Sequence, residues 1–227
     1  MLADRHVIPD RVTPVAYVTF ATPHLGSRQH RHLLGTWAPS WASASLFGTT
    51  GRQLMLDDDD AGPPLLVRLA RPPFITGLAL FQKRVAYGNV HGDGIVHYAT
   101  STVRRFNPFD GAAPAAPWVV VEDKHDNGDR RPRNAHVNEM VGNLERLDWQ
   151  RLAVRPGRSL FAHVDIVVVL EAFSAPYGRP IVDDVAERVI GALHDQLLLH
   201  PAPSSSLLVR MVDDVLFGSD DADRPAR

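Results

Sequence analysis

Val15-Ala-Tyr-Val-Thr-Phe-Ala-Thr-Pro-His-Leu-Gly26 is an apolar run that stops at a Thr-Pro-His turn. Only Thr19 interrupts the run before the turn, which is typical of a parallel strand buried on both faces. Pro23 lacks an N–H and disfavours helical geometry at Thr22, so we expect the strand to end there. The pattern predicts that Thr22, Pro23 and His24 lie at the carboxyl edge of the strand, where open α/β sheets bind ligands.

Five further segments accompany this strand in a definite order. They are Gly51-Arg-Gln-Leu-Met-Leu-Asp57, Pro64-Leu-Leu-Val-Arg-Leu-Ala70, Phe81-Gln-Lys-Arg-Val-Ala-Tyr-Gly-Asn-Val90, Asp93-Gly-Ile-Val96 and Thr100-Ser101. Together with Phe20-Ala-Thr-Pro-His-Leu-Gly-Ser27 they resemble the serine esterase family of lipase-like α/β-hydrolases. The resemblance covers residues 12 to 200 and is strongest up to residue 105. It implies an α/β fold class, a partial α/β-hydrolase fold with a mostly parallel sheet, a helical lid insertion and a C-terminal helix.

Composition sets the outer limits of function. The 227 residues, 44% of them hydrophobic, suffice for one domain with a sizeable core. A net charge of −2 gives no general attraction to nucleic acid or acidic membranes, and the lack of cysteine excludes thiolate catalysis and Cys-ligated metal. No apolar run approaches the roughly 20 residues of a membrane span. A cytoplasmic location is the default expectation, and it stays open if the N-terminus is incomplete.

The chain is expected to consist of three parts. Residues 1–14 form a lead-in, residues 15–200 the C-terminal part of the hydrolase domain, and residues 201–227 a flexible tail. Within the domain we expect a helical lid region at 27–83 and a loop insertion at 107–134. Four lid residues are candidates for an acyl pocket or lid face: Trp37, Trp41, Leu46 and Phe47. The alternative is a helical insertion that only packs on the edge of the sheet.

Periodicity predicts further elements. A second strand is expected at 85–90, and residues 118–122 are strand-like. The charged residues 122–131 show no periodicity and predict a solvated loop. Apolar residues at helical spacing predict a short helix that begins near Val137, and a longer helix at 182–199.

Ester hydrolysis by a serine enzyme requires a nucleophile, a histidine base and a carboxylate that orients the histidine. The resemblance implies that Asp93 is the acid and His163 the histidine, and it makes Thr22, Pro23, His24 and Gly26 motif residues beside the site. Acyl or lipid esters are the implied substrates. No cofactor is implied.

The nucleophile does not follow the family pattern. No serine has glycines both two positions before it and two positions after it, so the Gly-x-Ser-x-Gly elbow and its oxyanion donors are missing from this sequence. This chain therefore matches the C-terminal portion of the family's domain, and we expect no hydrolysis by it alone. The alternative function is a hydrolase-derived binding or dimerisation module, in which an unpaired sheet edge recruits a second copy or a partner.

Simpler roles remain open for the same residues. His24 is expected to be a hydrogen-bonded structural residue, Asp93 suits an ordinary turn, and His163 suits the protein surface. The run 57–60 reads as solvated charge rather than as a calcium loop. Two metal sites are further alternatives. One would use Asp123, His125, Asp126 and Asp129. The other is a metal-dependent hydrolase built on His91, Asp93 and His163.

Overall fold

The computed structural model describes residues 13–27, 48–60, 62–113, 118–128, 134–156, 162–167 and 171–199. The expected lid residues Trp37, Trp41, Leu46 and Phe47 lie outside these described residues. The chain divides into two compact units, residues 1–181 and 182–227. The sheet and the candidate site belong to the first unit.

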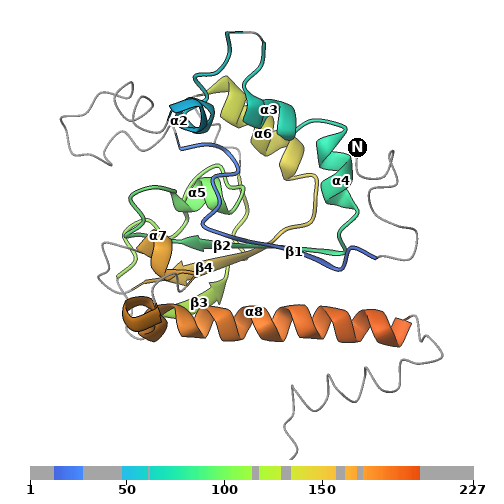
Figure 1. Ribbon diagram of the computed structural model, residues 1–227, viewed down its shortest axis with the longest axis vertical. Helices are drawn as coiled ribbons and strands as arrows, with labels where there is room; N and C mark the ends of the chain where they lie inside the picture. The colour runs from blue at the N-terminus through green and yellow to red at the C-terminus, as the bar shows by residue number, and fades with distance from the viewer. Residues whose placement is uncertain are drawn as a thin grey trace, which may run out of the picture. The chain divides into compact units, whose positions relative to one another are not determined.

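The first unit is a mixed α/β structure built on one four-stranded sheet of order β1-β2-β4-β3 (Figure 1). The strands are β1 (Ala16–Phe20), β2 (Lys83–Asn89), β3 (Val119–Glu122) and β4 (Gln150–Arg155). β1 pairs with β2 in parallel, β2 pairs with β4 in parallel, and only the β3–β4 pairing is antiparallel. The predicted mostly parallel sheet is confirmed, and it is compatible with a partial α/β-hydrolase fold.

Above the sheet, as Figure 1 is drawn, lie α2 (Gly48–Leu54), α3 (Leu65–Leu69), α4 (Phe74–Ala79) and α6 (Ala135–Leu144). α5 (Tyr98–Ser101) and α7 (Ala162–Asp165) are single turns. The core between helices and sheet contains Leu25, Leu56, Val67, Ala70, Ala86, Val103, Val137, Met140, Val141, Leu144 and Trp149.

Local chemistry explains where α6 begins. The side chain of Asn134 accepts a hydrogen bond from the N–H of Val137 at 3.1 Å, which satisfies one of the helix's unpaired donors. Val137, Met140, Val141 and Leu144 recur at three- and four-residue steps and are buried. The helix predicted near Val137 is therefore present, but it ends at Leu144.

β4 was not predicted from the sequence. Its apolar core is only Leu152, Ala153 and Val154, with an arginine on each side, so it does not look like a central strand. The Nε of Arg151 donates a hydrogen bond to the carbonyl of Thr102 at 2.9 Å, which satisfies the guanidinium within the sheet.

The final helix differs from its predicted bounds, because α8 (Glu171–Leu199) begins eleven residues before the predicted position 182. It includes Pro176 and Pro180, and nothing in the structure explains this tolerance.

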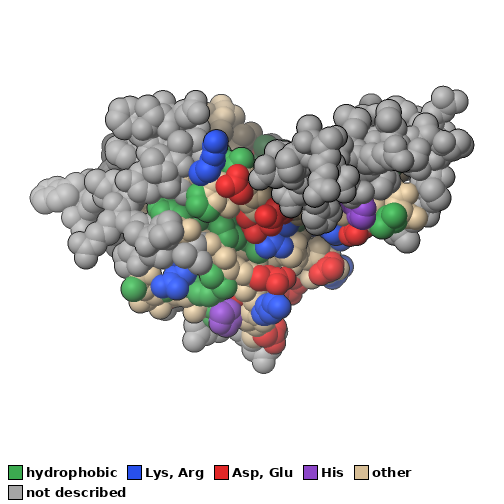
Figure 2. All heavy atoms as spheres, turned by 90° about the horizontal axis from the view of Figure 1, so that it is seen from below, with side chains coloured by type: hydrophobic (Ala, Val, Ile, Leu, Met, Phe, Trp, Pro, Cys, Tyr) green, Lys and Arg blue, Asp and Glu red, His purple; other side chains and the backbone are tan. Residues whose placement is uncertain are grey.

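On the face shown in Figure 2, the described Lys and Arg side chains are interspersed with Asp and Glu side chains. None of the helices within the described ranges is long and apolar enough to cross a membrane.

Candidate active site

The structure brings Asp93 and His163 together although they are 70 residues apart in sequence. Asp93 follows the C-terminal end of β2, and His163 lies in α7, beyond the end of β4 (Figure 1). Asp93 Oδ2 and His163 Nδ1 are 3.1 Å apart, with side chains 2% and 29% exposed. The carboxylate is therefore withdrawn from water while the imidazole remains accessible.

The surroundings of Asp93 decide how this pair is protonated. Burial acts to raise its pKa, but hydrogen bonds from His163 and from the N–H of Val96 outweigh burial and lower it. An ionised carboxylate can only accept a hydrogen bond, so His163 must carry its proton on Nδ1. Nε2 of His163, which has no partner among the described residues, is then left with a free lone pair that can take a proton.

A tight turn fixes the carboxylate of Asp93. Its Oδ1 accepts hydrogen bonds from the N–H groups of Ile95 and Val96, at 2.9 and 2.8 Å. Its Oδ2 also accepts from Asn89 Nδ2 at 3.1 Å. Asp93 is thus both a turn aspartate and the partner of His163. Asn89 was not predicted from the sequence as a site residue. The signal that could have indicated it is the position of an amide side chain at the end of the predicted strand, four residues before Asp93.

The metal hypotheses gain no support. Among the residues described, no group of three or more His, Cys, Asp or Glu side chains is arranged to hold a metal ion. His91 instead hydrogen-bonds the carbonyl of Pro156 through Nε2, at 3.0 Å. The described residues therefore give no support to the metal-dependent hydrolase built on His91, Asp93 and His163. In the acidic run, Asp60 pairs with Arg52 at the surface and Asp58 accepts from the N–H of Leu65.

The turn after β1 is clamped to two other elements. Thr100 in α5 accepts from the N–H of Leu25 at 2.9 Å and donates to the carbonyl of Gly26 at 2.7 Å. The N–H of Ser27 donates to the carbonyl of Leu54 at 2.7 Å. Gly26 has φ +77°, and a Cβ there would lie 2.7 Å from the same carbonyl oxygen. Only glycine fits this position without a shift of the backbone.

His24 folds back from this turn onto the sheet. Its Nε2 lies 3.1 Å from the hydroxyl of Thr19, and its ring packs against Trp149 with centroids 5.4 Å apart. Burial lowers the pKa of His24 to about 4, so the ring is neutral at physiological pH. These contacts favour the structural interpretation of His24.

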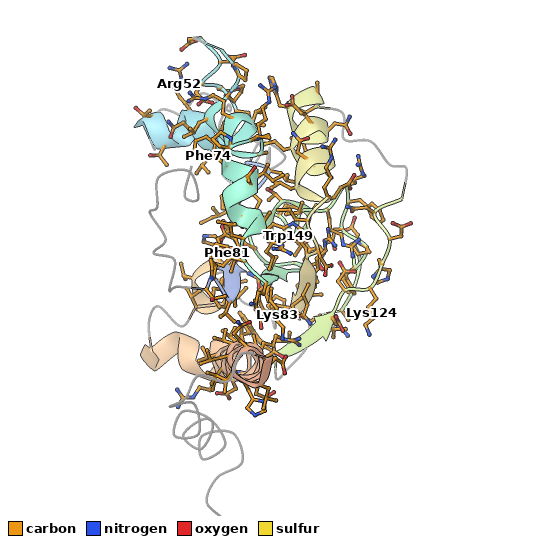
Figure 3. The ribbon with its side chains drawn as sticks, turned by 90° about the vertical axis from the view of Figure 1, so that its right-hand side faces the viewer. Arg52, Phe74, Phe81, Lys83, Lys124 and Trp149 are labelled. Atoms are coloured by element: carbon orange, nitrogen blue, oxygen red, sulfur yellow. The ribbon has the colours of Figure 1, made fainter. Side chains whose placement is uncertain are left out.

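An apolar pocket of about 430 Å³ lies beside the turn. Thr22, Pro23 and His24 form part of its wall, so the motif residues line a cavity even though Gly26 does not. Two of its lining residues are labelled in Figure 3: Phe74, the first residue of α4, and Phe81, which follows the end of that helix. The rest of the lining consists of Tyr17, Leu54, Leu66, Leu69, Ala70, Pro73, Gly77, Leu78 and Leu144.

A second buried carboxylate corrects one prediction. Asp123 was expected in a solvated loop, yet its side chain is 0% exposed and pairs with Arg104, 1% exposed, at 2.6 Å. Tyr98 donates to it at 2.6 Å, and His125 Nδ1 lies 2.9 Å from its other oxygen. Runs of charged residues are usually exposed to solvent, but here the buried carboxylate of Asp123 is neutralised by Arg104. These contacts engage both oxygens of the carboxylate without a metal.

No serine hydroxyl contacts His163 within the described ranges. Ser27 and Ser101 are 4% and 0% exposed, and Ser101 donates its hydroxyl proton to the carbonyl of Tyr98. The base of the candidate site therefore has no nucleophile from this part of the chain.

Comparison with known proteins confirms the resemblance seen in the sequence. Residues 2–103 match the model of the family described as "Putative serine esterase". Two proteins of Saccharomyces cerevisiae named putative lipases are 35% and 34% identical over 98 residues. The aligned residues cover 41% of this chain in both cases, and 14% and 13% of the relatives.

A putative lipase of Schizosaccharomyces pombe is 33% identical over 98 residues, which cover 40% of this chain and 12% of the relative. The chain thus matches only about one seventh of the length of these curated relatives, 14% at most. No solved structure matches the chain. The match ends at residue 103, so it includes Asp93 but not His163.

Proposed function

We propose that this chain supplies the acid and the base of a Ser-Asp-His ester hydrolase of the lipase-like kind. The observation that carries the proposal is the 3.1 Å contact between Asp93 Oδ2 and His163 Nδ1 at the C-terminal edge of the sheet. The family that residues 2–103 match and the names of the yeast relatives support ester hydrolysis as the reaction class. The serine comes from a segment with the Gly-x-Ser-x-Gly elbow, which these 227 residues do not contain.

The protonation state of the pair determines the steps. His163 Nε2 takes the hydroxyl proton of the serine while its Oγ attacks the ester carbonyl, and Asp93 stabilises the imidazolium that forms. The tetrahedral intermediate collapses when the alkoxide leaves with the proton from Nε2. Water then attacks the acyl-enzyme with the same base, which releases the acid and regenerates the serine.

Lipid or other acyl esters are the proposed substrates. The lining of the pocket of about 430 Å³ suits this class because it is mostly aliphatic or aromatic, although neither Asp93 nor His163 belongs to it. The only histidine in its wall, His24, is neutral at physiological pH, so it adds no charge that would repel an acyl chain. The expected acyl-pocket residues Trp37, Trp41, Leu46 and Phe47 remain part of the proposal.

The test begins with the coding sequence around these 227 residues. The longest in-frame product that contains a Gly-x-Ser-x-Gly segment is expressed and assayed with p-nitrophenyl esters. We expect hydrolysis that Asp93→Asn and His163→Gln each reduce about 10²- to 10⁴-fold. The matched control is His136→Gln, a half-buried histidine at the start of α6, which should not change the rate.

A fluorophosphonate probe provides the complementary measurement. Such a probe reacts with activated serines, so the 227-residue chain alone should remain unlabelled. Stoichiometric labelling of any serine in it would contradict the proposal. Full activity of the Asp93→Asn variant in the longer product would contradict it as well.

A binding or dimerisation module is the second candidate. One observation favours it: within the described ranges β1 pairs only with β2, so it is an edge strand. An unpaired apolar edge can accept a strand from a second copy or from another protein. This function needs no serine, so the lack of any in-frame Gly-x-Ser-x-Gly segment would favour it over the hydrolase.

A further inference from the structure

We infer that Asn89 is a positioning residue that fastens α7 to the acid, so that His163 presents Nδ1 to Asp93. This inference rests on the proposed function of the Asp93–His163 pair. Asn89 is the last residue of β2 and is 1% exposed. Its side chain therefore lies on a rigid element, held by the pairing of β2 with β4.

The amide of Asn89 makes two contacts that meet at the site. Nδ2 donates to Asp93 Oδ2 at 3.1 Å and to the backbone carbonyl of Ala162 at 3.0 Å. Ala162 directly precedes His163, so one amide nitrogen contacts the acid and the backbone that carries the base. Both N–H bonds of the amide are thereby used.

The orientation of the amide follows from its neighbours. An ionised carboxylate and a backbone carbonyl can only accept hydrogen bonds, so the NH₂ group must face both of them. The oxygen Oδ1 then points elsewhere, and it is buried without a hydrogen-bond partner among the described residues. A buried acceptor without a partner is unfavourable, which indicates that the two donated bonds outweigh it.

Few side chains could replace Asn89 here. A primary amide is the short neutral group with two N–H donors on one atom, whereas a hydroxyl donates only once and a carboxylate would bring a second negative charge beside Asp93. The anchor matters because α7 has only four residues, too few to hold its own orientation through helical bonds. Without it, His163 keeps the single contact to Oδ2 and can rotate away.

The experiment measures the tautomer of His163 by NMR, so it does not depend on ester hydrolysis. The full chain is labelled with ¹⁵N-histidine, and the His163 signals are assigned by their loss in His163→Gln. Near pH 8 the wild type should show mainly the Nδ1–H tautomer. Asn89→Leu, which removes both donors at similar volume, should lower the Nδ1–H fraction and remove the slowly exchanging Nδ1 proton signal.

Two further variants make the result interpretable. Asn107→Leu is the matched control, because Asn107 Nδ2 donates to the carbonyl of Val90 at 2.8 Å but, among the described residues, Asn107 forms no hydrogen bond with Asp93 or α7. It should leave the tautomer unchanged. Asp93→Asn tests the pair itself, because its amide can donate to Nδ1 and should favour the Nε2–H tautomer.

The outcomes separate the inference from the function on which it rests. If Asp93→Asn changes the tautomer and Asn89→Leu does not, the positioning role is overturned while the acid–base pair stands. If neither variant changes it, the pair itself fails. Asn89→Ala is the second variant, since it cannot clash. If both Asn89 variants unfold while Asn107→Leu folds, Asn89 is only structural and the inference is overturned.

Discussion

At the scale of single residues, the buried carboxylates of Asp93 and Asp123 lie in contrasting environments. Asp123 is neutralised by the guanidinium of Arg104, which is 1% exposed, and its other oxygen contacts His125. Asp93 is paired with His163, whose side chain is 29% exposed, and it has no arginine or lysine partner among the described residues. The first arrangement suits structure and the second suits chemistry.

Removal of the Asp123 carboxylate should therefore be costly for stability. Asp123→Ala leaves the charge of Arg104 buried without a counter-ion, and we expect a loss of about 3–5 kcal/mol in the free energy of unfolding. Urea denaturation measures it. The control is Asp60→Asn, which breaks the solvent-screened surface pair with Arg52 and should leave the free energy of unfolding almost unchanged. Equal losses in the two variants would contradict the structural role of Asp123.

His24 should make stability dependent on pH. Burial lowers its pKa from 6.5 to about 4 in the folded state, so the folded protein binds a proton less readily than the unfolded chain. The contribution of the neutral ring is present above about pH 6.5 and is lost as the pH falls toward 4. Between pH 7 and pH 5, this linkage amounts to about 2 kcal/mol.

The variant His24→Gln isolates this effect, because glutamine can still hydrogen-bond Thr19 but does not titrate in this range. Urea denaturation at pH 7 and pH 5 should show that the wild type loses about 2 kcal/mol more than the variant. His97, whose pKa burial also lowers, contributes to both proteins and cancels. The same pH dependence in both proteins would show that His24 is not the titrating group.

At the scale of elements, the turn after β1 depends on a glycine. Gly26→Ala must adopt φ +77° and place a Cβ 2.7 Å from the carbonyl oxygen of Leu54, so we expect a loss of about 3 kcal/mol. Gly128→Ala has a similar φ of +58° but nothing within 4 Å, and should cost only about 1 kcal/mol. Thermal unfolding of both variants measures the difference, and equal costs would show that the close approach is unimportant.

The elements that could be predicted from sequence are those with a clear local signal. β1 is an apolar run that only Thr19 interrupts, and α6 has apolar residues at helical spacing. β2 and β4 each have three consecutive apolar residues, but β2 lies in one of the motifs of the family resemblance, whereas β4 is flanked by arginines. Arg151 is tolerated in β4 because Thr102 offers a carbonyl from elsewhere in the chain. Such compensation is a tertiary contact, so no local pattern reveals it.

The candidate site shows the same division. The resemblance implied Asp93 and His163, but it did not indicate Asn89, whose role depends on the carbonyl of Ala162, 73 residues away. The burial of Asp123 was also invisible in a loop of charged residues, because Arg104 approaches it only in the folded chain. In both cases the contact that determines the role of the residue joins positions that are distant in sequence.

At the scale of the whole molecule, the open edge of β1 is the feature that bears on assembly. Val15 and Ala21 make their backbone bonds toward β2, through Lys83 and Tyr87. Because strand residues alternate, Ala16 and Val18 direct their N–H and C=O groups outward. Within the described part of the chain these groups meet no partner strand.

We therefore expect the isolated chain to associate through β1, and light scattering should show a mass that rises above 25.0 kDa with concentration. Val18→Pro removes an outward N–H without breaking the β2 ladder, so it should keep the chain monomeric. Thr19→Pro is the matched control, because it removes an inward N–H and should destabilise the fold instead. A wild-type mass of 25.0 kDa at every concentration would argue that this edge is not a pairing surface.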